Sequence, residues 1–414
     1  MDMDELLKRV LSLPAPWTIT GAKLDEEKRS VDVYVTYEAS EGPCPECSEI
    51  CKRHDTVERR WRHLDLCDHQ TWIVCKIPRV RCAEHKVHTL QVPWADGWAR
   101  FTARFECVVI DWLKEASMTA VARNLGLSWD QVNGIQERAV ARGLSRREAI
   151  APKRIGVDET SFQKRHEYVT IVTDLDNTRV LYVADDRKQS SLDGFFEGLD
   201  KPTRSGIEVI AMDMHHPYIY SAATYVPEVL SRLCFDRFHV AQLFSRAMDS
   251  VRRSETKRLA KEGETSLIGT RYLWLKSKAG LSKPLRKKLA ALLETASTVA
   301  SVWAIKEAAS KLWDYTSKTW AWKAWLTLCQ AARRLEIPAL DQVINTVLRH
   351  LFGIVNAITL KATNAASESI NSRVQAIKRR ANGYRDRERF RAAIMFHLGG
   401  LDLYPSVEGN AAVR

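Results

Sequence analysis

The chain has 414 residues, of which 45% are hydrophobic, so it can bury more than one core, and about two to four domains are expected. Its 63 Lys and Arg residues outnumber the 51 Asp and Glu residues, and the net charge of +12 favours a polyanionic partner. No apolar run is long enough to span a bilayer, and the first residues are acidic, so membrane and secreted classes are disfavoured and a cytoplasmic protein is expected.

The first hundred residues predict a short helix at 6–13 and strands at 30–37 and 70–77, where apolar residues alternate or cluster. Between the two strands, Arg60 and Arg62 flank the indole of Trp61. A basic segment with an embedded aromatic ring suits a surface that faces DNA phosphates, and Arg62 is therefore predicted to contact DNA.

Two close pairs of potential metal ligands lie in the same region. Two residues separate Cys44 from Cys47, and two separate Cys82 from His85. Pairs of this spacing are typical of one tetrahedral Zn²⁺ held by three thiolates and one imidazole. The alternative is that some of the nine cysteines are ordinary buried thiols. The rival ligands that the sequence leaves open are Cys51, His54, Cys67, Cys75 and His88.

Residues 101–150 are predicted to be helical. Within them, residues 118–132 contain a helix, a turn at Gly126, an N-cap at Ser128 and a second helix, which is the spacing of a helix-turn-helix. An ordinary helical hairpin is the alternative. The residues of this region predicted to contact DNA are Ser128, Trp129, Gln131 and Arg138.

From residue 154 to about residue 250 the pattern reads strand, strand, strand, helix, strand, helix, strand, helix. Three antiparallel strands followed by two crossover strands is the order of the α/β ribonuclease-H-like fold. The strands are expected near 154–158, 166–175, 179–184, 208–212 and 230–235, and the helices near 190–198, 217–226 and 240–258.

Two of these strands are expected to end at a carboxylate, the first at Asp158 and the fourth at Asp213. A carboxylate at the end of a buried strand loses hydration, which is unfavourable unless a cation lies beside it. Neighbouring strands would bring the two carboxylates to one point, as a divalent-metal site for phosphoryl transfer requires. Taken alone each acid is a weak signal, because Asp is common where strands end. Glu159 should face away from Asp158.

Residues 255–345 are helical in pattern and rich in Lys, Arg and Trp. The favoured interpretation is that the indoles fill a helical core, and the alternative is that one or two stack on unpaired bases. The clustered tryptophans are Trp303, Trp313, Trp320, Trp322 and Trp325.

Residues 363–380 read as one helix with Asn364 as its N-cap. One stripe, with Ile370, Val374 and Ile377, should lie against the sheet. A second stripe can face a site, and it contains Glu368, Asn371, Ser372 and Gln375. Basic residues on and after the helix suit contact with the backbone of a duplex, although a solvated charged face is their ordinary meaning. Those predicted to contact DNA are Arg373, Lys378, Arg379, Arg380 and Arg385.

Taken together, these features resemble a DDE transposase of a bacterial insertion sequence, of the ISL-three group, over nearly the whole chain. Many relatives have Cys where His85 stands, and smaller residues where Ser367 and Ser369 flank Glu368. The matching residues are Cys44/Cys47 with Cys82/His85, residues 93–95 and 101–102, the helix-turn-helix, Val157-Asp158-Glu159, Met212-Asp213-Met214, Asp236-Arg237-Phe238-His239, residues 363–368, Lys378-Arg379-Arg380 and Gly383-Tyr384-Arg385.

The resemblance implies that Asp158, Asp213 and Glu368 form the catalytic triad. Asp158 and Asp213 would bridge two Mg²⁺ ions, for which Mn²⁺ can substitute, and Glu368 would hold the second. The Asp236-x-x-His239 motif resembles one that follows the second acid in many such enzymes. His239 would position a phosphate or a carboxylate there, and a purely structural histidine is the alternative.

The partner implied is double-stranded DNA. The zinc module and the helix-turn-helix would read the terminal inverted repeats, and the catalytic core would cleave the element ends and join the 3′-OH to target DNA. Concerted cutting of two ends implies a homodimer on paired ends. The alternatives are a metal-dependent nuclease or Holliday-junction resolvase of the same fold, and a DNA-binding regulator with an inactive core.

The predicted domains follow from these assignments. They are an N-terminal zinc-binding module at 1–100, a helix-turn-helix domain at 101–150, the first part of the catalytic core at 151–255, an inserted helical domain at 256–350, the last helix of the core with a basic segment at 351–400, and a flexible tail at 401–414.

Overall fold

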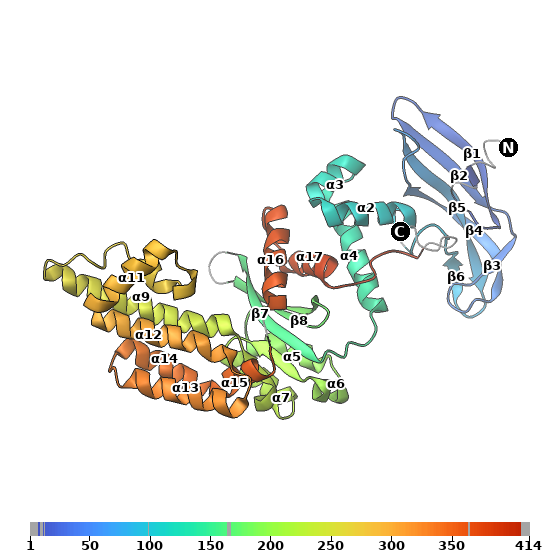
Figure 1. The fold of residues 1–414 in the computed structure, drawn as a ribbon. Helices are drawn as coiled ribbons and strands as arrows, with labels where there is room; N and C mark the ends of the chain where they lie inside the picture. Colours follow the sequence, from blue (N-terminus) through green and yellow to red (C-terminus); the bar gives the residue numbers. More distant parts are fainter. Residues whose placement is uncertain are drawn as a thin grey trace. The chain divides into compact units, whose positions relative to one another are not determined.

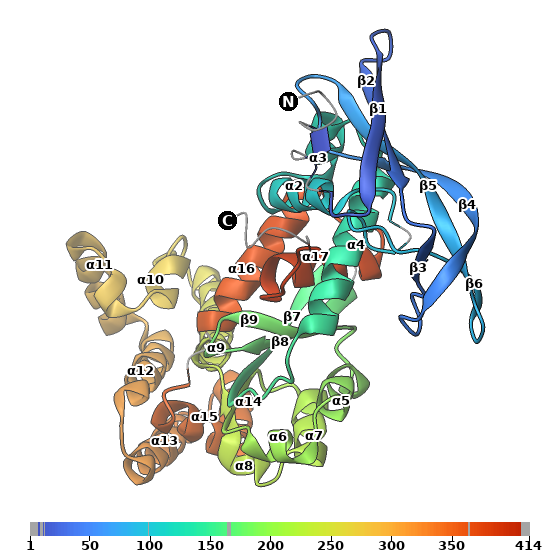
Figure 2. The ribbon, with the colours of Figure 1, turned by 90° about the vertical axis from the view of Figure 1, so that its right-hand side faces the viewer.

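The computed structural model describes residues 7–8, 11, 13–97, 99–163, 167–362 and 365–406, and the chain divides into two compact units (Figure 1 and Figure 2). The first unit contains the chain up to Arg147 together with the segment from Leu401, and the second runs from Glu148 to Gly400. The predicted N-cap Asn364 lies outside the described residues, as do parts of the predicted helix at 6–13 and of the predicted tail. None of the described helices is both long and apolar enough to cross a membrane.

The sheet of the first unit has the strand order β1-β2-β5-β4-β3, with β6 paired to β5. β2 and β5 are parallel, and the other neighbours are antiparallel. The predicted strand at 30–37 is confirmed, whereas the one predicted at 70–77 continues to Cys82. The bounds are β1 Trp17–Asp25, β2 Ser30–Tyr37, β3 Glu41–Pro43, β4 Ile50–Arg62, β5 Gln70–Cys82 and β6 Lys86–Thr89.

Three helices follow this sheet, α2 Ala103–Glu115, α3 Met118–Leu125 and α4 Trp129–Arg146. Each begins after a hydroxyl side chain that accepts a hydrogen bond from the first turn, and these N-caps are Thr102, Ser117 and Ser128. Gly126 ends α3 at φ +63°, in the left-handed region that favours glycine. The helices and the turn predicted at 118–132 are therefore confirmed.

The segment from Leu401 to Ser406 lies along α2 and α4, and we call it the C-terminal strap. Arg142 of α4 donates to the Leu403 carbonyl at 2.8 Å, and Arg146 donates to the Tyr404 carbonyl at 2.6 Å. Arg146 also pairs with Asp402 at 3.0 Å. The prediction of an unstructured tail was wrong for these residues, because arginines of a distant helix hold their backbone, which no local pattern reveals.

A buried imidazole joins the sheet of the first unit to its helices. His63 Nδ1 lies 2.9 Å from the hydroxyl of Thr102, the N-cap of α2. Burial lowers the pKa of His63 to about 4, with help from the nearby charges of Arg104 and Arg62. His63 is therefore neutral in the folded unit over a pH range in which the unfolded chain would bind a proton.

The first unit should consequently lose stability as the pH falls from about 6.5 towards 4, because only the unfolded state takes up the proton. The expected slope is about 1.4 kcal/mol per pH unit from this one group. Thermal unfolding of wild type and His63→Gln between pH 4 and pH 7.5 measures the effect, and the variant should show the shallower pH dependence. Equal slopes in the two proteins would contradict the assignment.

The second unit contains a five-stranded sheet of order β11-β10-β7-β8-β9. β7, β8 and β9 are antiparallel neighbours, while β10 is parallel to both β7 and β11. The predicted strand order is thereby confirmed, but β7 does not end at Asp158, since it continues to Gln163. The bounds are β7 Arg154–Gln163, β8 Glu167–Asp174, β9 Arg179–Asp185, β10 Val209–Met212 and β11 Leu233–Phe235.

Helices cover both faces of this sheet (Figure 2). On one face, Val157 joins the apolar cluster to which Phe195 of α5 and Tyr218 of α7 belong. On the other, Phe162 meets Phe390 of α17 at a ring separation of 5.6 Å, and α16 lies along β7. The bounds are α5 Gln189–Glu197, α6 Lys201–Gly206, α7 His216–Tyr225, α8 Val229–Arg232, α16 Ala365–Arg380 and α17 Arg387–Leu398.

A helical body stands between β11 and α16 in the sequence. Its apolar residues are continuous with the core of the sheet, and Trp274 and Trp325 are fully buried within it. Trp303 is also buried, whereas Trp320 and Trp322 are exposed, so the predicted indole core is confirmed only in part. The bounds are α9 Arg237–Lys261, α10 Arg271–Leu275, η1 Lys278–Gly280, α11 Lys283–Thr295, α12 Ser297–Lys311, η2 Leu312–Asp314, α13 Lys318–Arg333, α14 Pro338–Arg349 and α15 Leu351–Thr359.

Candidate functional site

The first candidate site is a cluster of three thiols and one imidazole in the first unit. One potential ligand atom from each of Cys44, Cys47, Cys82 and His85 lies within 4.8 Å of all the others. The Sγ atoms of Cys47 and Cys82 are 3.8 Å apart, and His85 Nδ1 lies 3.5 Å from Cys82 Sγ. A tetrahedral Zn²⁺ with Zn–S bonds of ~2.3 Å separates two thiolates by ~3.8 Å, so the cluster fits this ion.

Tight turns present these ligands. The residue after each pair, Ser48 and Lys86, has a positive φ of 63° and 66° respectively, which turns the chain sharply behind the second ligand. Hydrogen bonds from the His85 backbone and side chain are the main cause that lowers the pKa of Cys82 to about 6. A thiol that ionises readily is suited to bind a metal.

The rival ligands have other positions. His88 Nε2 lies 2.6 Å from the His85 carbonyl, and Cys75 is 1% exposed in the core of the sheet. Cys51 remains close, because a second group of ligand atoms within 4.8 Å contains Glu49, Cys51 and Cys82. The Cys51 thiol donates to the Glu49 carbonyl at 3.4 Å. The four-residue cluster is therefore the better candidate, with Cys51 as its nearest neighbour.

The second candidate site lies at the sheet of the second unit, where three carboxylates are in register. β10 pairs with β7 through Ala211 and Gly156, and with β11 through Met212 and Phe235. Continuing this register places Asp213 beside Asp158 and Asp236, all on one face of the sheet. The electrostatic influence of Asp213 and Asp236 on Asp158 agrees with this placement.

Asp158 is a buried carboxyl group with an unfavourable environment for its charge. Burial raises its pKa to about 6, despite a hydrogen bond of 2.7 Å from the Glu159 backbone N–H to Oδ1 and the neighbouring His239. The other oxygen, Oδ2, accepts a hydrogen bond of 2.7 Å from the side-chain amide of Asn371 on α16. The position therefore favours a bound cation, which would stabilise the ionised carboxylate.

His239 stands in the first turn of α9 beside these acids. Its Nδ1 lies 3.4 Å from Asp236 Oδ2, and this interaction raises the pKa of His239, assisted by the charges of Asp213 and Asp158. Asp236 also caps α9 by accepting from the Phe238 N–H at 3.0 Å. The sequence singled out His239, whereas Asp236 itself was not among the predicted site residues.

Helix α16 is fixed to β7 by a polar seam of three side chains. Asn371 contacts Asp158, Gln375 donates to the Thr160 hydroxyl at 2.6 Å, and Lys378 donates to the Ser161 carbonyl at 2.9 Å. Ile370, Val374 and Ile377 are buried beneath the helix, as predicted. Ser372, predicted to face the site, is exposed and lies outside the seam.

Glu368 lies one turn before Asn371 on α16, so it stands over the same face of the sheet as Asp158, and it is exposed. Among the described residues, groups of three or more potential ligand atoms within 4.8 Å of one another occur only in the first unit. The carboxylates of Asp158, Asp213 and Glu368 are therefore not all within that distance of one another. Two buried polar atoms beside it, the Ser367 hydroxyl and Asn371 Oδ1, have no hydrogen-bond partner among the described residues. The helix therefore offers further oxygen donors here.

The seam predicts an effect of Asn371 on activity. Replacing Asn371 with Leu should lower the rate of the DNA cleavage expected from the sequence by about 10- to 100-fold, because the amide that orients Asp158 is lost while the apolar contacts of the helix remain. Thermal unfolding should show that the variant stays folded. Asn371→Gln and the exposed-site control Ser372→Ala are measured alongside, and full activity in Asn371→Leu would contradict the positioning role.

The residues predicted to contact DNA in the first unit have diverse environments. Arg62 is 2% exposed, and its guanidinium lies over the Phe105 ring and pairs with Asp65, so the prediction that it contacts DNA was wrong. Ser128 and Gln131 are exposed but form the capping box of α4. Arg138 pairs at 2.6 Å with Glu106, which is buried. Trp129 is half-buried at the start of α4.

The predicted basic residues of the second unit are mostly on the surface. Arg373, Arg379 and Arg380 are exposed on α16, and Arg385 is exposed in the turn before α17. Lys378 is half-buried and donates to β7, so it serves the polar seam. The exposed guanidinium groups can reach a phosphate backbone.

The chain matches three family models. The first is described as a transposase and covers residues 155–394, the second is the helix-turn-helix domain of transposase family ISL3 at residues 90–140, and the third is the zinc-finger of transposase IS204/IS1001/IS1096/IS1165 at residues 40–85. These matches span the thiol–imidazole cluster, helices α3 and α4, and the sheet with its three acids.

Curated relatives agree with these matches. The chain is 26% identical over 375 residues to the transposase for insertion sequence element IS1001 of Bordetella parapertussis, with 88% of this chain and 91% of that protein covered. It is also 26% identical over 395 residues to the transposase for insertion sequence element IS1557 of Mycobacterium tuberculosis, with 86% of each chain covered.

Proposed function

This chain belongs to the ISL3 family of insertion-sequence transposases, and we propose that it binds the terminal inverted repeats of its element, cleaves DNA at the element ends and joins the freed 3′-OH to target DNA. The observation that carries the proposal is the meeting of Asp158 with Asn371, 213 residues apart, on the central strand β7, where Asp213 and Asp236 are in register with Asp158. Such convergence of polar groups around a buried acid is typical of a catalytic centre.

We further propose that the second unit has a ribonuclease-H-like core. Its support is the strand order, in which three antiparallel strands, β9, β8 and β7, are followed outward by β10 and β11, both parallel to β7. Asp158 lies on the central strand β7, and Asp213 directly follows the neighbouring strand β10. This arrangement supports a catalytic face that the two acids share. The helical body would be an insertion before the last core helix.

Asp158, Asp213 and Glu368 are proposed to hold two Mg²⁺ ions, for which Mn²⁺ can substitute. The donor set consists of oxygens, which hard divalent cations prefer, and the buried Asp158 lacks a counter-charge of matching strength. When bound, such ions lower the pKa of an attacking water or 3′-OH and stabilise the leaving oxygen. Glu368 is exposed and would complete the site by a change of side-chain rotamer.

The neighbouring protein groups would orient the substrate. Asn371 holds one oxygen of Asp158 and so fixes the direction of the other. His239 has a raised pKa beside Asp236, and in its protonated form it can donate to a phosphate oxygen. We propose that His239 is a positioning residue, because its imidazole pairs with Asp236, which is itself the N-cap of α9.

The first unit is proposed to read sequence. A structural Zn²⁺ on Cys44, Cys47, Cys82 and His85 would hold the ribbon, and α4 would enter the major groove. Ser128, Gln131 and Arg138 already have hydrogen-bond or ion-pair partners within the protein. We therefore propose that other exposed side chains of α4 contribute to the base contacts as well. A homodimer on paired ends is proposed for concerted cutting.

The test is incubation of the purified protein with a labelled duplex that carries its element's end and the flanking donor DNA, with Mg²⁺ and with EDTA. Mg²⁺-dependent nicking at the junction, followed by joining of the end to a second duplex, is expected. Nicking without any joined product would favour the nuclease alternative, and binding without nicking would favour the regulator.

A further inference from the structure

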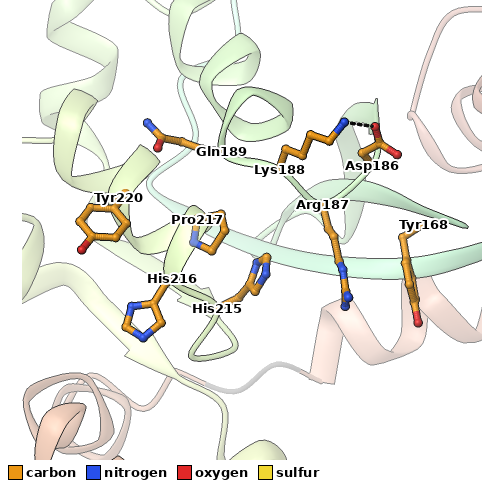
Figure 3. Close-up of a pocket in the computed structure, with 9 residues that line it drawn as sticks. All are labelled: Tyr168, Asp186, Arg187, Lys188, Gln189, His215, His216, Pro217 and Tyr220. Carbon is orange, nitrogen blue, oxygen red and sulfur yellow. Dashed lines mark ion pairs between the residues drawn. The ribbon is translucent and has the colours of Figure 1, made fainter. Parts of the chain in front are cut away.

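A hollow of about 600 Å³ opens on the second unit, at the face of the sheet that α5 and α7 cover (Figure 3). Its walls come from three places in the sequence: the start of β8, the turn between β9 and α5, and the first turn of α7. Pockets of about 300–1,000 Å³ are large enough for a small organic ligand. The residues that line it are Tyr168, Asp186, Arg187, Lys188, Gln189, His215, His216, Pro217 and Tyr220.

Four of the nine residues that line the hollow carry a flat ring. Tyr220 is 63% exposed, and its ring lies 6.3 Å from that of His216 at an interplanar angle of 32°. The guanidinium of Arg187 lies 4.7 Å from the centre of the Tyr168 ring. Figure 3 shows these side chains around one opening, with Tyr220 and His216 on one side and Arg187 and Tyr168 on the other. Exposed rings of this kind bind the faces of other aromatic systems.

The charges around the hollow are largely paired. Arg187 lies 3.3 Å from Glu159, and Lys188 lies 3.1 Å from Asp186. The hollow is therefore not a purely cationic phosphate site, and its chemistry favours an aromatic ring with polar edges. His215 Nδ1 is buried, has no hydrogen-bond partner in the part of the chain that the structure describes, and supplies one polar atom for such an edge.

The hollow is adjacent to the acids through the backbone. Glu159, which holds Arg187, follows Asp158 directly, and its side chain is on the opposite face of the strand. The His215 N–H donates to Asp213 Oδ1 at 3.2 Å, so His215 bridges the hollow and the carboxylate edge. His215 is therefore the residue at which the lining of the hollow adjoins the carboxylates, and a DNA strand held at the acids would meet the hollow there.

We propose that this hollow receives one unpaired nucleobase of the DNA strand next to the scissile phosphate, with Tyr220 and His216 against the base and Arg187 at its edge. The inference rests on the proposed cleavage function and deepens it. Taking a base out of the stack is unfavourable, and stacking on aromatic side chains offsets the loss without requiring a particular base.

The test is a double-mutant cycle that combines removal of one side chain from the protein with removal of one base from the DNA. Wild type, Tyr220→Ala and Tyr220→Phe are assayed on element-end duplexes in which each nucleotide around the junction is replaced in turn by an abasic residue. On intact DNA, Tyr220→Ala should cleave about tenfold or more slowly, and Tyr220→Phe should restore the ring and most of the rate. At one position, the abasic residue should abolish the difference between wild type and Tyr220→Ala, because no base is left to stack.

Tyr272 provides the matched control, since its ring is 68% exposed on α10 and does not line the hollow. Tyr272→Ala should show no position-specific coupling. The same cycle is repeated by measuring the Kd for each DNA with Ca²⁺ in place of Mg²⁺. This binding measurement does not depend on cleavage. An undiminished wild-type to Tyr220→Ala ratio at every abasic position overturns the inference. A wild type that binds with the expected coupling but never cleaves overturns the proposed function instead.

Discussion

Asp158→Asn should abolish strand cleavage, with a loss of at least about a thousandfold, while binding to the element end is unchanged. The substitution keeps the size of the side chain and an oxygen that can accept from Asn371, but it removes the negative charge that a divalent cation requires. The first unit, which is proposed to bind the ends, is not altered. Single-turnover nicking of an end-labelled duplex and a gel-shift titration with the same DNA measure the two properties.

The same variant should be more stable than wild type in EDTA at pH 7. The pKa of Asp158 is raised to about 6 by burial, so the folded state favours its neutral form, and stability is lost as the pH rises from about 4 to 6. Asn remains neutral and should recover about 1–3 kcal/mol. A variant that is more stable but inactive would show that Asp158 serves catalysis and not the stability of the fold.

Asp176→Asn is the matched control, because Asp176 belongs to the turn between β8 and β9 and pairs only loosely with Arg154, at 3.8 Å. It should cleave at nearly the wild-type rate. Normal cleavage by Asp158→Asn would show that the acid is not a metal ligand. Loss of DNA binding together with cleavage would instead indicate that the substitution disturbs the protein as a whole.

Removal of the metal from the first unit should unfold its ribbon. Structural Zn²⁺ sites contribute about 10–16 kcal/mol, which is as large as the whole net stability of a typical domain, about 5–15 kcal/mol. Purified wild type should contain about one Zn²⁺ per chain, and Cys44→Ser should contain far less. Metal analysis by mass spectrometry and proteolysis of strands β3 to β6 test this, and end binding should disappear in the variant.

Cys67→Ser is the control for this prediction, since Cys67 is an exposed thiol outside the cluster and should not affect metal content. Cys51→Ser distinguishes the neighbouring thiol, and it should retain the ion because Cys51 donates to the Glu49 carbonyl. A metal-free wild type that resists proteolysis would contradict the zinc site. Equal zinc content in Cys44→Ser and wild type would contradict the ligand assignment.

The sequence alone predicted those parts of the fold that have a strong local signal. Alternation predicted β2, β8 and β9, and the serine caps with Gly126 predicted α3 and α4. The extension of β7 beyond Asp158 was missed, because residues 158–163 are polar apart from Phe162 and are stabilised by β8 and by side chains of α16 that follow some 200 residues later. The 13-residue β4 was also missed, since its charged residues hide its period.

The parts of the candidate sites that have a local sequence signal, such as the spacing of metal ligands, could be predicted. The strand end expected at Asp158 was wrong, since β7 continues to Gln163, but Asp213 does follow β10 directly. Ligand spacing predicted the cluster of Cys44, Cys47, Cys82 and His85. Tertiary partners were not predictable: Asn371 was expected to face the site, but its contact with Asp158 requires the folded sheet. Arg62 looked like a DNA contact, yet folding buries its charge beside Phe105.

The C-terminal strap has a consequence for how the protein is made. Arg142 and Arg146 of α4 find their carbonyl partners in Leu403 and Tyr404, so the helices of the first unit wait for residues that are synthesised 261 and 258 positions later. Asn371, too, is synthesised long after the strand that it contacts. A product truncated before residue 371 would form neither the strap contacts nor the hydrogen bond from Asn371 to Asp158, so both units would be left incomplete by one truncation.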